Sequence, residues 1–525
     1  MLVRDVAYEV LNRAGMTTVF GNPGSNELPF LAGMPEPFRY VLGLHEGAVL
    51  GMADGYAQVT GQPVLVSLHA ASGSGNAMGA LTNAVYSRTP LVLLAGQQAR
   101  PAIGAEAMLA NVDATALAKP LVGWAGEPSC AADVPRSVAQ AVFEARLRRR
   151  PSYLSVPYDD WTVPADASSL AVLERSVERS ARPESRQIAR LVGLVREARR
   201  PALVFGGDVD ADGLFDEATA LAERLGAPAW AAPSLHRLPF PNRHPLFRGV
   251  LPAGIAPLAD ALAGHDLVLV LGAPVFRYHE YVPGAYLPEG THLVHITDDA
   301  EAAARAPVGE CVVTDPGSVI GELLKALPDS TARIPRYSAP PAPEPGADGA
   351  LHPEQVFAAL RETQSPDTRY VVESTSTNKA WWRQMDLRRG GSYFFPAAGG
   401  LGFGIPGAVG AALAQPERPV VGVIGDGSAN YGITALWTAA QLGLPVTFVL
   451  LRNGVYGALR WFADLLDAQS APGTSIPDID FVRIAEGYGV SAVHANDLDQ
   501  LRAVLRQAPV GPRLVQVDTS PTTPV

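Results

Sequence analysis

The stretch VIGDGSANYG, residues 423–432, places an aspartate between two glycines directly after an apolar run. The β-branched residues of that run are typical of a buried strand. A helical pattern comes next, and then a second apolar run, VTFVLL (446–451), which ends just before Asn453. Strand, helix and strand in this order predict a βαβ unit with parallel strands and a right-handed crossover.

The two loops of this unit predict a metal–diphosphate site. If the strands are neighbours, the loops after them meet at the same edge of the sheet. Asp426 and Asn453 would then face one another. A carboxylate and an amide oxygen suit Mg²⁺, which fills its other positions with phosphate and water. Either loop alone is an ordinary surface turn, but the two loops together favour the metal site.

Short apolar runs alternate with helical patterns along the whole chain. Near-continuous apolar strands separated by helices are typical of parallel sheets covered on both faces. Two segments have the composition of unordered linkers. Segment 175–187 is charged, and segment 335–355 is rich in Pro, Ala and Gly. We therefore predict an α/β protein of three doubly wound parallel-sheet domains, at 1–175, 183–335 and 350–525.

The bulk composition excludes several classes of partner. The chain has 525 residues, and its net charge of −11 argues against a nucleic-acid surface and against an anionic membrane surface. Cys130 and Cys311 are the only cysteines, which favours a reducing compartment. The N-terminus has no signal-peptide apolar core, and no apolar run reaches the length of a membrane span. We expect a cytoplasmic protein without a membrane or nucleic-acid partner.

The predicted metal–diphosphate site at Asp426 and Asn453 resembles the diphosphate-binding signature of thiamine-diphosphate enzymes. In that signature, G-D-G is followed a little under thirty residues later by Asn-Asn. Arg452 replaces the first asparagine, and Asn453 matches the second, which ligates the metal in that family. The resemblance implies thiamine diphosphate and Mg²⁺ (or Ca²⁺) as cofactors. It also implies a ligand set of Asp426, Asn453 and the backbone carbonyl of Val455.

Such an enzyme needs a glutamate that hydrogen-bonds the aminopyrimidine ring of the cofactor. Glu46, in the stretch RYVLGLHEGAVLGMADGYAQ, follows a predicted strand and begins a helical pattern. A lone glutamate there is more often an ordinary first-turn residue stabilised by the helix dipole. The surrounding pattern resembles the aminopyrimidine-side domain of the family, so we expect the functional role.

Motifs from about residue 16 to the C-terminus resemble those of the benzoylformate decarboxylases, one family of thiamine-diphosphate enzymes. They are FGNPGSNELPF, SLHAASGSGNAMGAL, VPYDDW, LGAPVFRYHEY, ESTST, AAGGLGFGIP, GDGSANYGITALWTAAQ and NGVYGALRWF. The resemblance implies that Ser25 binds the substrate carboxylate and that His69 and His279 relay protons. From the residues alone, the more frequent roles are a turn with a helix cap for Ser25, a structural histidine for His69 and a solvated loop residue for His279.

The same resemblance implies a set of cofactor contacts and an apolar pocket for the aryl group. Leu401 would be the apolar wedge beneath the cofactor, although a plain core leucine is a common alternative. The other implied cofactor contacts are Thr375, Gly399, Gly425, Gly427, Ser428, Tyr431, Tyr456 and Gly457. The implied pocket residues, besides Ser25, are Met108, Leu109, Phe395, Ala458, Leu459 and Phe462.

Three positions depart from the family pattern. Met108 stands where leucine is expected, Val455 where threonine is expected and Ala70 where serine is expected. None of these changes removes a proton-transfer group. The methionine is flexible, so the pocket would tolerate a slightly different acyl group.

The resemblance implies non-oxidative decarboxylation of an aryl 2-oxo acid, benzoylformate to benzaldehyde and CO₂, on a route from mandelate to benzoate. It also implies a homo-oligomer, at least a dimer and by resemblance a tetramer. One alternative is a 2-oxo acid decarboxylase or carboligase with a different acyl preference. Others are a flavin-bearing enzyme of the acetolactate synthase type and a non-catalytic thiamine-diphosphate sensor or scaffold.

Overall fold

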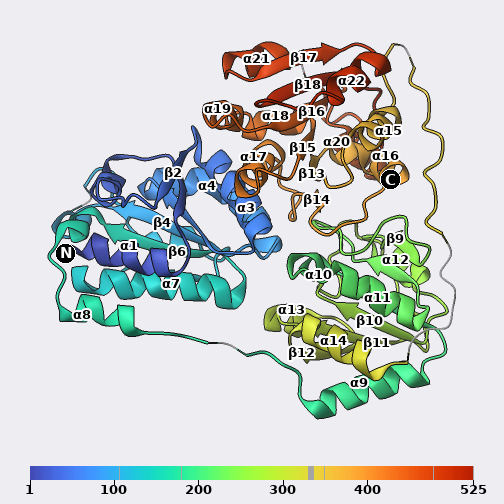
Figure 1. The fold of residues 1–525 in the computed structure, drawn as a ribbon, viewed down its shortest axis with the longest axis horizontal. Coiled ribbons are helices and arrows are strands. Elements are labelled where there is room, and N and C mark those ends of the chain that lie inside the picture. Colours follow the sequence, from blue (N-terminus) through green and yellow to red (C-terminus); the bar gives the residue numbers. More distant parts are fainter. Residues whose placement is uncertain (106, 179, 329–335, 348, 477, 524–525) are drawn as a thin grey trace.

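The structure is a computed structural model. Its fold consists of three parallel six-stranded sheets with helices packed on them (Figure 1). The structure describes residues 1–525 except 106, 179, 329–335, 348, 477 and 524–525. Each sheet belongs to a separate part of the chain, and every strand pair within them is parallel. The predicted α/β fold class is confirmed.

The N-terminal sheet has the order β2-β1-β3-β4-β6-β5. Its strands are β1 (Thr18–Gly21), β2 (Arg39–Leu42), β3 (Val64–Leu68), β4 (Leu91–Gln97), β5 (Trp124–Gly126) and β6 (Ser152–Pro157). Its helices are α1 (Val3–Arg13), η1 (Ser25–Glu27), α2 (Leu28–Leu31), α3 (Glu46–Thr60), α4 (Ala70–Tyr86), α5 (Arg100–Ile103), α6 (Ala114–Leu117), η2 (Ala131–Asp133), α7 (Val134–Arg148), η3 (Tyr158–Thr162), α8 (Ala167–Leu170) and η4 (Ala171–Glu174).

The middle sheet has the order β12-β11-β10-β7-β8-β9. Its strands are β7 (Pro201–Phe205), β8 (Ala229–Ala231), β9 (Phe247–Val250), β10 (Leu267–Leu271), β11 (His292–Thr297) and β12 (Glu310–Val313). Its helices are α9 (Ser185–Glu197), α10 (Gly207–Ala211), α11 (Phe215–Leu225), α12 (Ile255–Ala261), α13 (Ala300–Arg305) and α14 (Pro316–Ala326).

The C-terminal sheet has the order β14-β13-β15-β16-β18-β17. Its strands are β13 (Arg369–Glu373), β14 (Tyr393–Phe394), β15 (Val420–Gly425), β16 (Val446–Arg452), β17 (Ser491–Ala495) and β18 (Arg513–Asp518). Its helices are α15 (Pro353–Thr363), η5 (Thr375–Thr377), α16 (Asn378–Gln384), α17 (Gly404–Ala414), α18 (Asp426–Gly432), α19 (Ala435–Gln441), α20 (Gly457–Leu465), α21 (Phe481–Gly487) and α22 (Leu498–Leu505).

The apolar runs identified in the sequence form all the central strands except β8, and one of them, RYVLGL, forms the edge strand β2, whereas the other edge strands carried no such signal. Strands β5, β9, β12, β14 and β17 lie at sheet edges, and β8 is only three residues long. Strands β5, β9, β12 and β17 are partly exposed, so their residues need not form a continuous apolar run, and β14 is buried but only two residues long. β12, for example, buries Val312 but exposes Val313.

The N-terminal and C-terminal domains share one hydrophobic core through helices α3 and α17. The core cluster includes Val49 and Met52 from α3 together with Ile405 and Ala408 from α17. The helices approach so closely at Gly55 that a Cβ atom there would lie 2.3 Å from the carbonyl oxygen of Gly407. Figure 1 shows α3 and α17 at the junction of the two domains. The N-terminal and C-terminal domains therefore form a tightly packed interface within one chain.

The second predicted linker is more ordered than its composition indicates. Outside residues 335 and 348, which the structure does not describe, the backbone of Ser338 donates to Arg243 O and that of Glu344 donates to Glu354. Helix α15 already begins at Pro353. In the first linker, the carbonyl of Ala181 accepts from the backbone N–H of Asp315. The domain boundaries drawn at these segments stay predictions.

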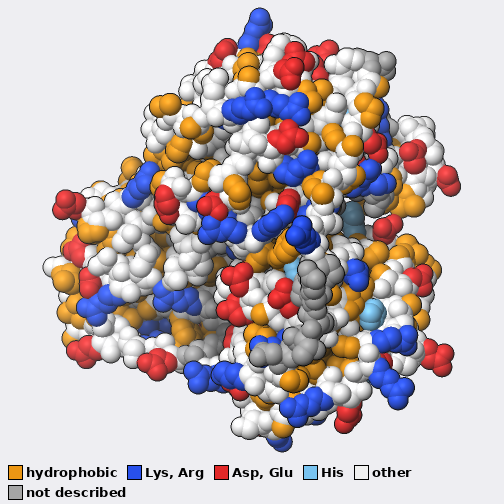
Figure 2. All heavy atoms as spheres, turned by 45° about the vertical axis from the view of Figure 1, so that its right-hand side comes forward, with side chains coloured by type: hydrophobic (Ala, Val, Ile, Leu, Met, Phe, Trp, Pro, Cys, Tyr) orange, Lys and Arg blue, Asp and Glu red, His pale blue; other side chains and the backbone are white. Residues whose placement is uncertain are grey.

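The surface agrees with the composition. On the face in Figure 2, acidic and basic side chains are interspersed, and they form no continuous basic stripe there. Cys130 and Cys311 are both free. In the described part of the chain, no helix is long and apolar enough to cross a membrane.

Candidate active site

Glu46 is the first residue of α3 and lies just beyond the end of β2. Although it is only 7% exposed, its carboxylate oxygens accept hydrogen bonds from two neutral amides. The donors are Asn22 Nδ2 at 3.3 Å and Asn76 Nδ2 at 3.0 Å. A buried carboxylate held by neutral donors keeps hydrogen-bonding capacity for a ring nitrogen, so Glu46 fits the aminopyrimidine position.

His69 and Ser25 belong to the same end of the N-terminal sheet. The Nδ1 atom of His69 lies 2.9 Å from Oε2 of Glu27, and this oxygen also accepts from the backbone N–H of Gly24. Gly24 packs so closely on the imidazole that a Cβ atom there would lie 2.1 Å from His69 Nδ1. Ser25, the next residue, is exposed and begins η1. The structure therefore places Ser25, Glu27 and His69 in one cluster.

The backbone beside His69 is strained. Ala70 has a φ of +45°, in the left-handed region that residues other than glycine rarely adopt, and its carbonyl accepts from Ser74 Oγ. Leu109, one of the predicted pocket residues, has a φ of +68°. Such strain persists only where the surroundings impose it, and it is concentrated at functional sites. Met108, next to Leu109, is 84% exposed in the single chain.

Asp426 and Asn453 lie side by side at the carboxyl ends of the paired strands β15 and β16. Oδ2 of Asp426 accepts the backbone N–H groups of Asn453 at 3.0 Å and Gly454 at 2.7 Å. Oδ1 of Asn453 in turn accepts from the backbone N–H of Val455 at 3.1 Å. The predicted ligands are thus neighbours, as the βαβ unit required.

The donor set suits a hard cation. Burial raises the pKa of Asp426, while the N–H groups of Gly454, Gly427 and Asn453 and the charge of Arg452 lower it. A buried carboxylate beside amide and carbonyl oxygens is the type of site that Mg²⁺ or Ca²⁺ occupies. Arg452, the departure from the family motif, turns its guanidinium to Asp518, with both hydrogen bonds at 2.7 Å. Its side chain therefore leaves the oxygen set intact.

The predicted cofactor contacts gather around Asp426. Gly427 lies against the ring of Tyr456, where a Cβ atom would come within 2.6 Å. Gly457 packs on Ser376, the residue after Thr375, with a corresponding distance of 2.8 Å. Gly402, which follows Leu401, lies against Tyr431 with a corresponding distance of 3.0 Å, and Gly425 is in ordinary van der Waals contact with Ser374. Ser428 lies in α18 and is 7% exposed.

His279 comes from the middle domain but meets a predicted pocket residue of the C-terminal domain. Its ring lies edge-on to Phe462 of α20, with the ring centroids 5.0 Å apart. Ala458 and Leu459 lie on the same helix, and Leu459 is 51% exposed. Phe395 follows β14 and donates its backbone N–H to His236 O. The structure thus joins His279 to Phe462, whereas the ring of Phe395 stacks on Tyr393, which is not a predicted pocket residue, with centroids 6.4 Å apart.

The predicted residues fall into separate groups within one chain. The hydrogen-bond partners of Glu46 and His69 belong to the N-terminal domain, whereas those of Asp426 and Asn453 belong to the C-terminal domain. Sequence reasoning missed Glu27, Asn22 and Asn76, which hold the predicted catalytic side chains. Glu27 and Asn22 stand in the stretch FGNPGSNELPF, so their proximity to Ser25 was a usable signal.

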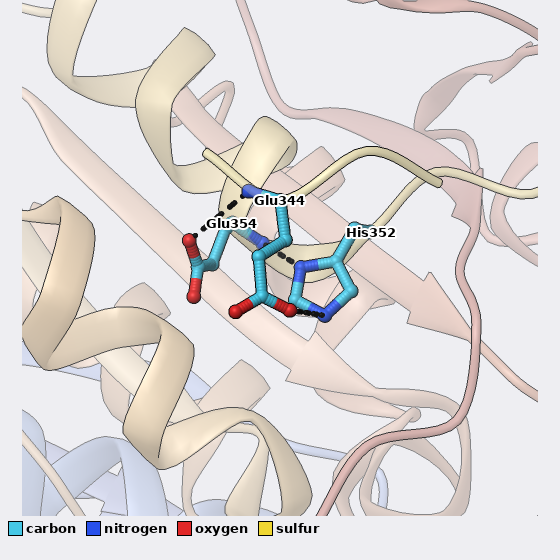
Figure 3. A group of neighbouring side chains, drawn as sticks. All are labelled: Glu344, His352 and Glu354. Atoms are coloured by element: carbon cyan, nitrogen blue, oxygen red, sulfur yellow. Dashed lines mark hydrogen bonds and ion pairs between the residues drawn. The ribbon is translucent and has the colours of Figure 1, made fainter. Parts of the chain in front are cut away.

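A separate group of possible metal ligands, Glu344, His352 and Glu354, lies beside a cavity of about 440 Å³ that Val455 and Gly457 also line (Figure 3). Arg383 already supplies a cation there. Its Nη1 atom lies 2.6 Å from Glu344 Oε1 and 3.0 Å from Glu354 Oε1. The Arg383 hydrogen bond also lowers the pKa of Glu344. This group is therefore a satisfied ion network.

Comparison with known proteins defines the class. Three domain descriptions match the sequence in order: thiamine pyrophosphate enzyme, N-terminal TPP binding domain, at 1–117; central domain, at 188–323; and C-terminal TPP binding domain, at 374–518. Thiamine pyrophosphate, or TPP, is another name for thiamine diphosphate. The chain belongs to the thiamine pyrophosphate enzyme family, and the cofactor expected from the sequence is that of the family.

Within this family, the chain is most informatively compared with individual decarboxylases. The chain is 54% identical to a benzoylformate decarboxylase of Pseudomonas aeruginosa, over 99% of each protein. It superposes with a TM-score of 0.97 on a thiamine diphosphate-dependent 4-hydroxybenzoylformate decarboxylase of Rhodococcus jostii, at 55% identity and 99% coverage of both chains. A benzoylformate decarboxylase of Polynucleobacter necessarius gives a TM-score of 0.94 at 34% identity, again over 99% of both chains.

Proposed function

We propose that the protein is a carboxy-lyase that removes CO₂ from an aryl 2-oxo acid, with benzoylformate as the substrate and benzaldehyde as the product. The observation that carries this proposal is the joint presence of both halves of the site. Ser25, Glu46 and His69 stand at one sheet end, and Asp426 and Asn453 stand at another. Two relatives named for decarboxylation of such acids match nearly the whole chain.

The C-terminal residues would hold the cofactor. Asp426, Asn453 and the Val455 carbonyl would bind Mg²⁺ (or Ca²⁺), and the metal would bind the diphosphate. Thr375, Gly399 and Leu401 would contact the rest of the cofactor. The remaining diphosphate contacts would be Gly425, Gly427, Ser428, Tyr431, Tyr456 and Gly457. When bound, thiamine diphosphate supplies the electron sink that loss of CO₂ requires.

The N-terminal residues would manage protons and orientation. Glu46 would hydrogen-bond the aminopyrimidine ring, and its two amide donors fix its orientation. The exposed hydroxyl of Ser25 would orient the substrate carboxylate. His69 would transfer a proton while Glu27 holds Nδ1, which leaves Nε2 to face the substrate. His279 would share the proton transfers.

The pocket would select an aryl group. Its apolar residues would exclude water, which favours conversion of a charged carboxylate into neutral CO₂. Phe462 holds the ring of His279 edge-on, so the pocket wall and one proton-transfer group are in direct contact. The other wall residues would be Met108, Leu109, Phe395, Ala458 and Leu459.

The separate grouping of the site residues supports a homo-oligomer. Predicted pocket residues Met108 and Leu459 are 84% and 51% exposed in the single chain, which leaves the pocket open to solvent. A second copy that covers them would dry the pocket, so a dimer is the minimum active unit and a tetramer fits the resemblance. We place this enzyme in the cytoplasm, on a route from mandelate to benzoate.

The test is benzaldehyde release from benzoylformate by the purified protein with thiamine diphosphate and Mg²⁺, beside a Glu46→Ala control. Release that needs both cofactors and falls by about 10²-fold or more in the control supports the proposal. No release by a protein that binds the cofactor contradicts the substrate assignment. Pyruvate, branched-chain and indolyl 2-oxo acids then test the alternative, a decarboxylase or carboligase of different acyl preference.

A further inference from the structure

Glu373, the last residue of β13, places a carboxylate in the interior beneath the loop that carries Leu401. The residue is 1% exposed. Its Oε1 atom accepts the backbone N–H groups of Gly402 at 2.8 Å and Phe403 at 3.0 Å, and its Oε2 atom accepts that of Gly404 at 2.9 Å. Burial raises the pKa of Glu373 to about 7, even though these three N–H groups act to lower it. The carboxylate is thus devoted to one stretch of backbone.

A second buried side chain holds the other end of the same loop. Asn83, on α4 of the N-terminal domain, is 2% exposed. Its Oδ1 atom accepts the backbone N–H of Ala398 at 3.1 Å, and its Nδ2 atom donates to the carbonyl of Gly400 at 2.8 Å. Leu401 is the one residue that lies between the two sets of contacts.

The sequence of the loop, AGGLGFG, fits a single fixed shape. Gly399 and Gly402 have φ values of +73° and +108°, which glycine adopts far more readily than other residues. Gly404 approaches Glu373 so closely that a Cβ atom would lie 2.7 Å from the Glu373 Cβ atom. The loop backbone is therefore packed directly against Glu373, with no space for a side chain at Gly404.

We propose that Glu373 and Asn83 are positioning residues that hold the Ala398–Gly404 loop from its two ends and thereby fix Leu401 against the bound cofactor. The proposal rests on the proposed function, in which Leu401 and Gly399 contact thiamine diphosphate. The two side chains come from different domains, so the position of Leu401 is tied to the packing of α4 on α3 and of α3 on α17.

A simpler role for Glu373 is to cap the N-terminus of α17, since a carboxylate there is favourable to the helix dipole. That role predicts a loss of stability alone. The positioning role predicts changes in the loop and in cofactor binding as well. Asn83 separates the two roles, because its contacts end before α17 begins.

The first test uses Glu373→Gln, which keeps the size of the side chain but turns one oxygen acceptor into an N–H₂ donor. Amide hydrogen exchange of the 397–405 peptide and the affinity for thiamine diphosphate with Mg²⁺ are measured beside the melting temperature. We expect faster exchange in the peptide and an affinity lower by about 10-fold, because a buried N–H loses its partner.

Asp160→Asn is the matched control. Asp160 is also a carboxylate within the interior, at 2% exposure, and its two oxygens accept hydrogen bonds from the side chain of Arg100. Neither residue belongs to the loop, to α3, to α4 or to α17. We expect this variant to have a lower melting temperature, with loop exchange and cofactor affinity like those of the unaltered protein.

Asn83→Asp supplies the independent arm, because it keeps the acceptor for Ala398 and loses the donor to Gly400. The same increase in loop exchange and loss of affinity is expected, and this variant decides the matter if Glu373→Gln fails to fold. A lower melting temperature with unchanged exchange and affinity in both variants would reduce Glu373 to a helix cap and overturn the proposal. These readouts need no substrate, so failure of benzoylformate decarboxylation would leave the result standing.

Discussion

The N-terminal and C-terminal domains share one strand order and differ in the residues at the carboxyl ends of their strands. The orders β2-β1-β3-β4-β6-β5 and β14-β13-β15-β16-β18-β17 are identical when each domain is counted from its own first strand. β3 thus corresponds to β15. His69 follows β3, and Asp426 follows β15. One topological position carries an imidazole in one domain and, in the other, the carboxylate that we propose as a metal ligand.

The topology therefore determines which positions line a site, and the side chains at those positions determine its chemistry. The middle domain makes the same point. Its order, β12-β11-β10-β7-β8-β9, is the strand order of dinucleotide-binding sheets. The turn after β7, Gly206-Gly207-Asp208, nevertheless lacks the G-x-G-x-x-G pattern. The strand order alone is therefore no argument for a flavin or nucleotide cofactor in this domain.

Removal of the metal should have the largest effect on activity, and it acts on the site in the C-terminal domain. We expect dialysis against a chelator to abolish activity, because Asp426 and Asn453 would bind the diphosphate only through the cation. Activity is measured before and after addition of Mg²⁺ or Ca²⁺. Full activity in the chelated, metal-free protein would contradict the role of the Asp426 site.

His69→Ala acts on the N-terminal side. We expect kcat to fall by about 10²- to 10⁴-fold, the usual contribution of a positioned acid or base, with cofactor affinity unchanged. Steady-state kinetics and a cofactor titration check this. A variant that loses cofactor affinity in parallel with kcat would contradict the assignment of proton transfer to the N-terminal domain and of cofactor binding to the C-terminal domain.

Glu27→Gln tests the support of His69 and should have a smaller effect. The amide keeps a contact with Nδ1 but removes the charge that lies 2.9 Å from the ring. We expect kcat to fall by about 10-fold, because Nδ1 loses the charged partner that fixes the orientation of the ring. Unchanged kcat and KM would mean that Glu27 serves packing alone.

Arg452→Asn, which restores the family asparagine, should have the smallest effect. The guanidinium pairs with Asp518 on a partly exposed surface, with side-chain exposures of 30% and 36%. Such pairs contribute about 0–1 kcal/mol to stability. We expect a small change in melting temperature and cofactor affinity within about 2-fold of the starting protein. A large gain in affinity would show that Arg452 disturbs the metal site.

Much of this arrangement could be predicted from the sequence, for identifiable reasons. The continuous apolar runs of β15 and β16 gave a clear signal, and their pairing brings Asp426 to Asn453. The edge strands β5, β9, β12 and β17 were missed because a partly exposed strand shows no such run, and β14 was missed because it is only two residues long. Composition also failed at 335–355, where hydrogen bonds to Arg243 and Glu354 order residues that look like a linker.

Long-range side-chain contacts lay beyond sequence reasoning. Glu373 meets a loop some thirty residues away, and Asn83 meets the same loop from another domain. No local pattern encodes such a contact, because it depends on how the sheets and helices pack. The pairing of His279 with Phe462 is of the same kind.

The most direct test of the division of labour is a calorimetric titration of thiamine diphosphate with Mg²⁺ into Glu46→Gln and Asp426→Ala, followed by turnover of benzoylformate. We predict that Glu46→Gln binds the cofactor with little change while its kcat falls by about 10²-fold or more. Asp426→Ala should bind the cofactor too weakly to measure. Normal binding by Asp426→Ala, or normal turnover by Glu46→Gln, would contradict the account.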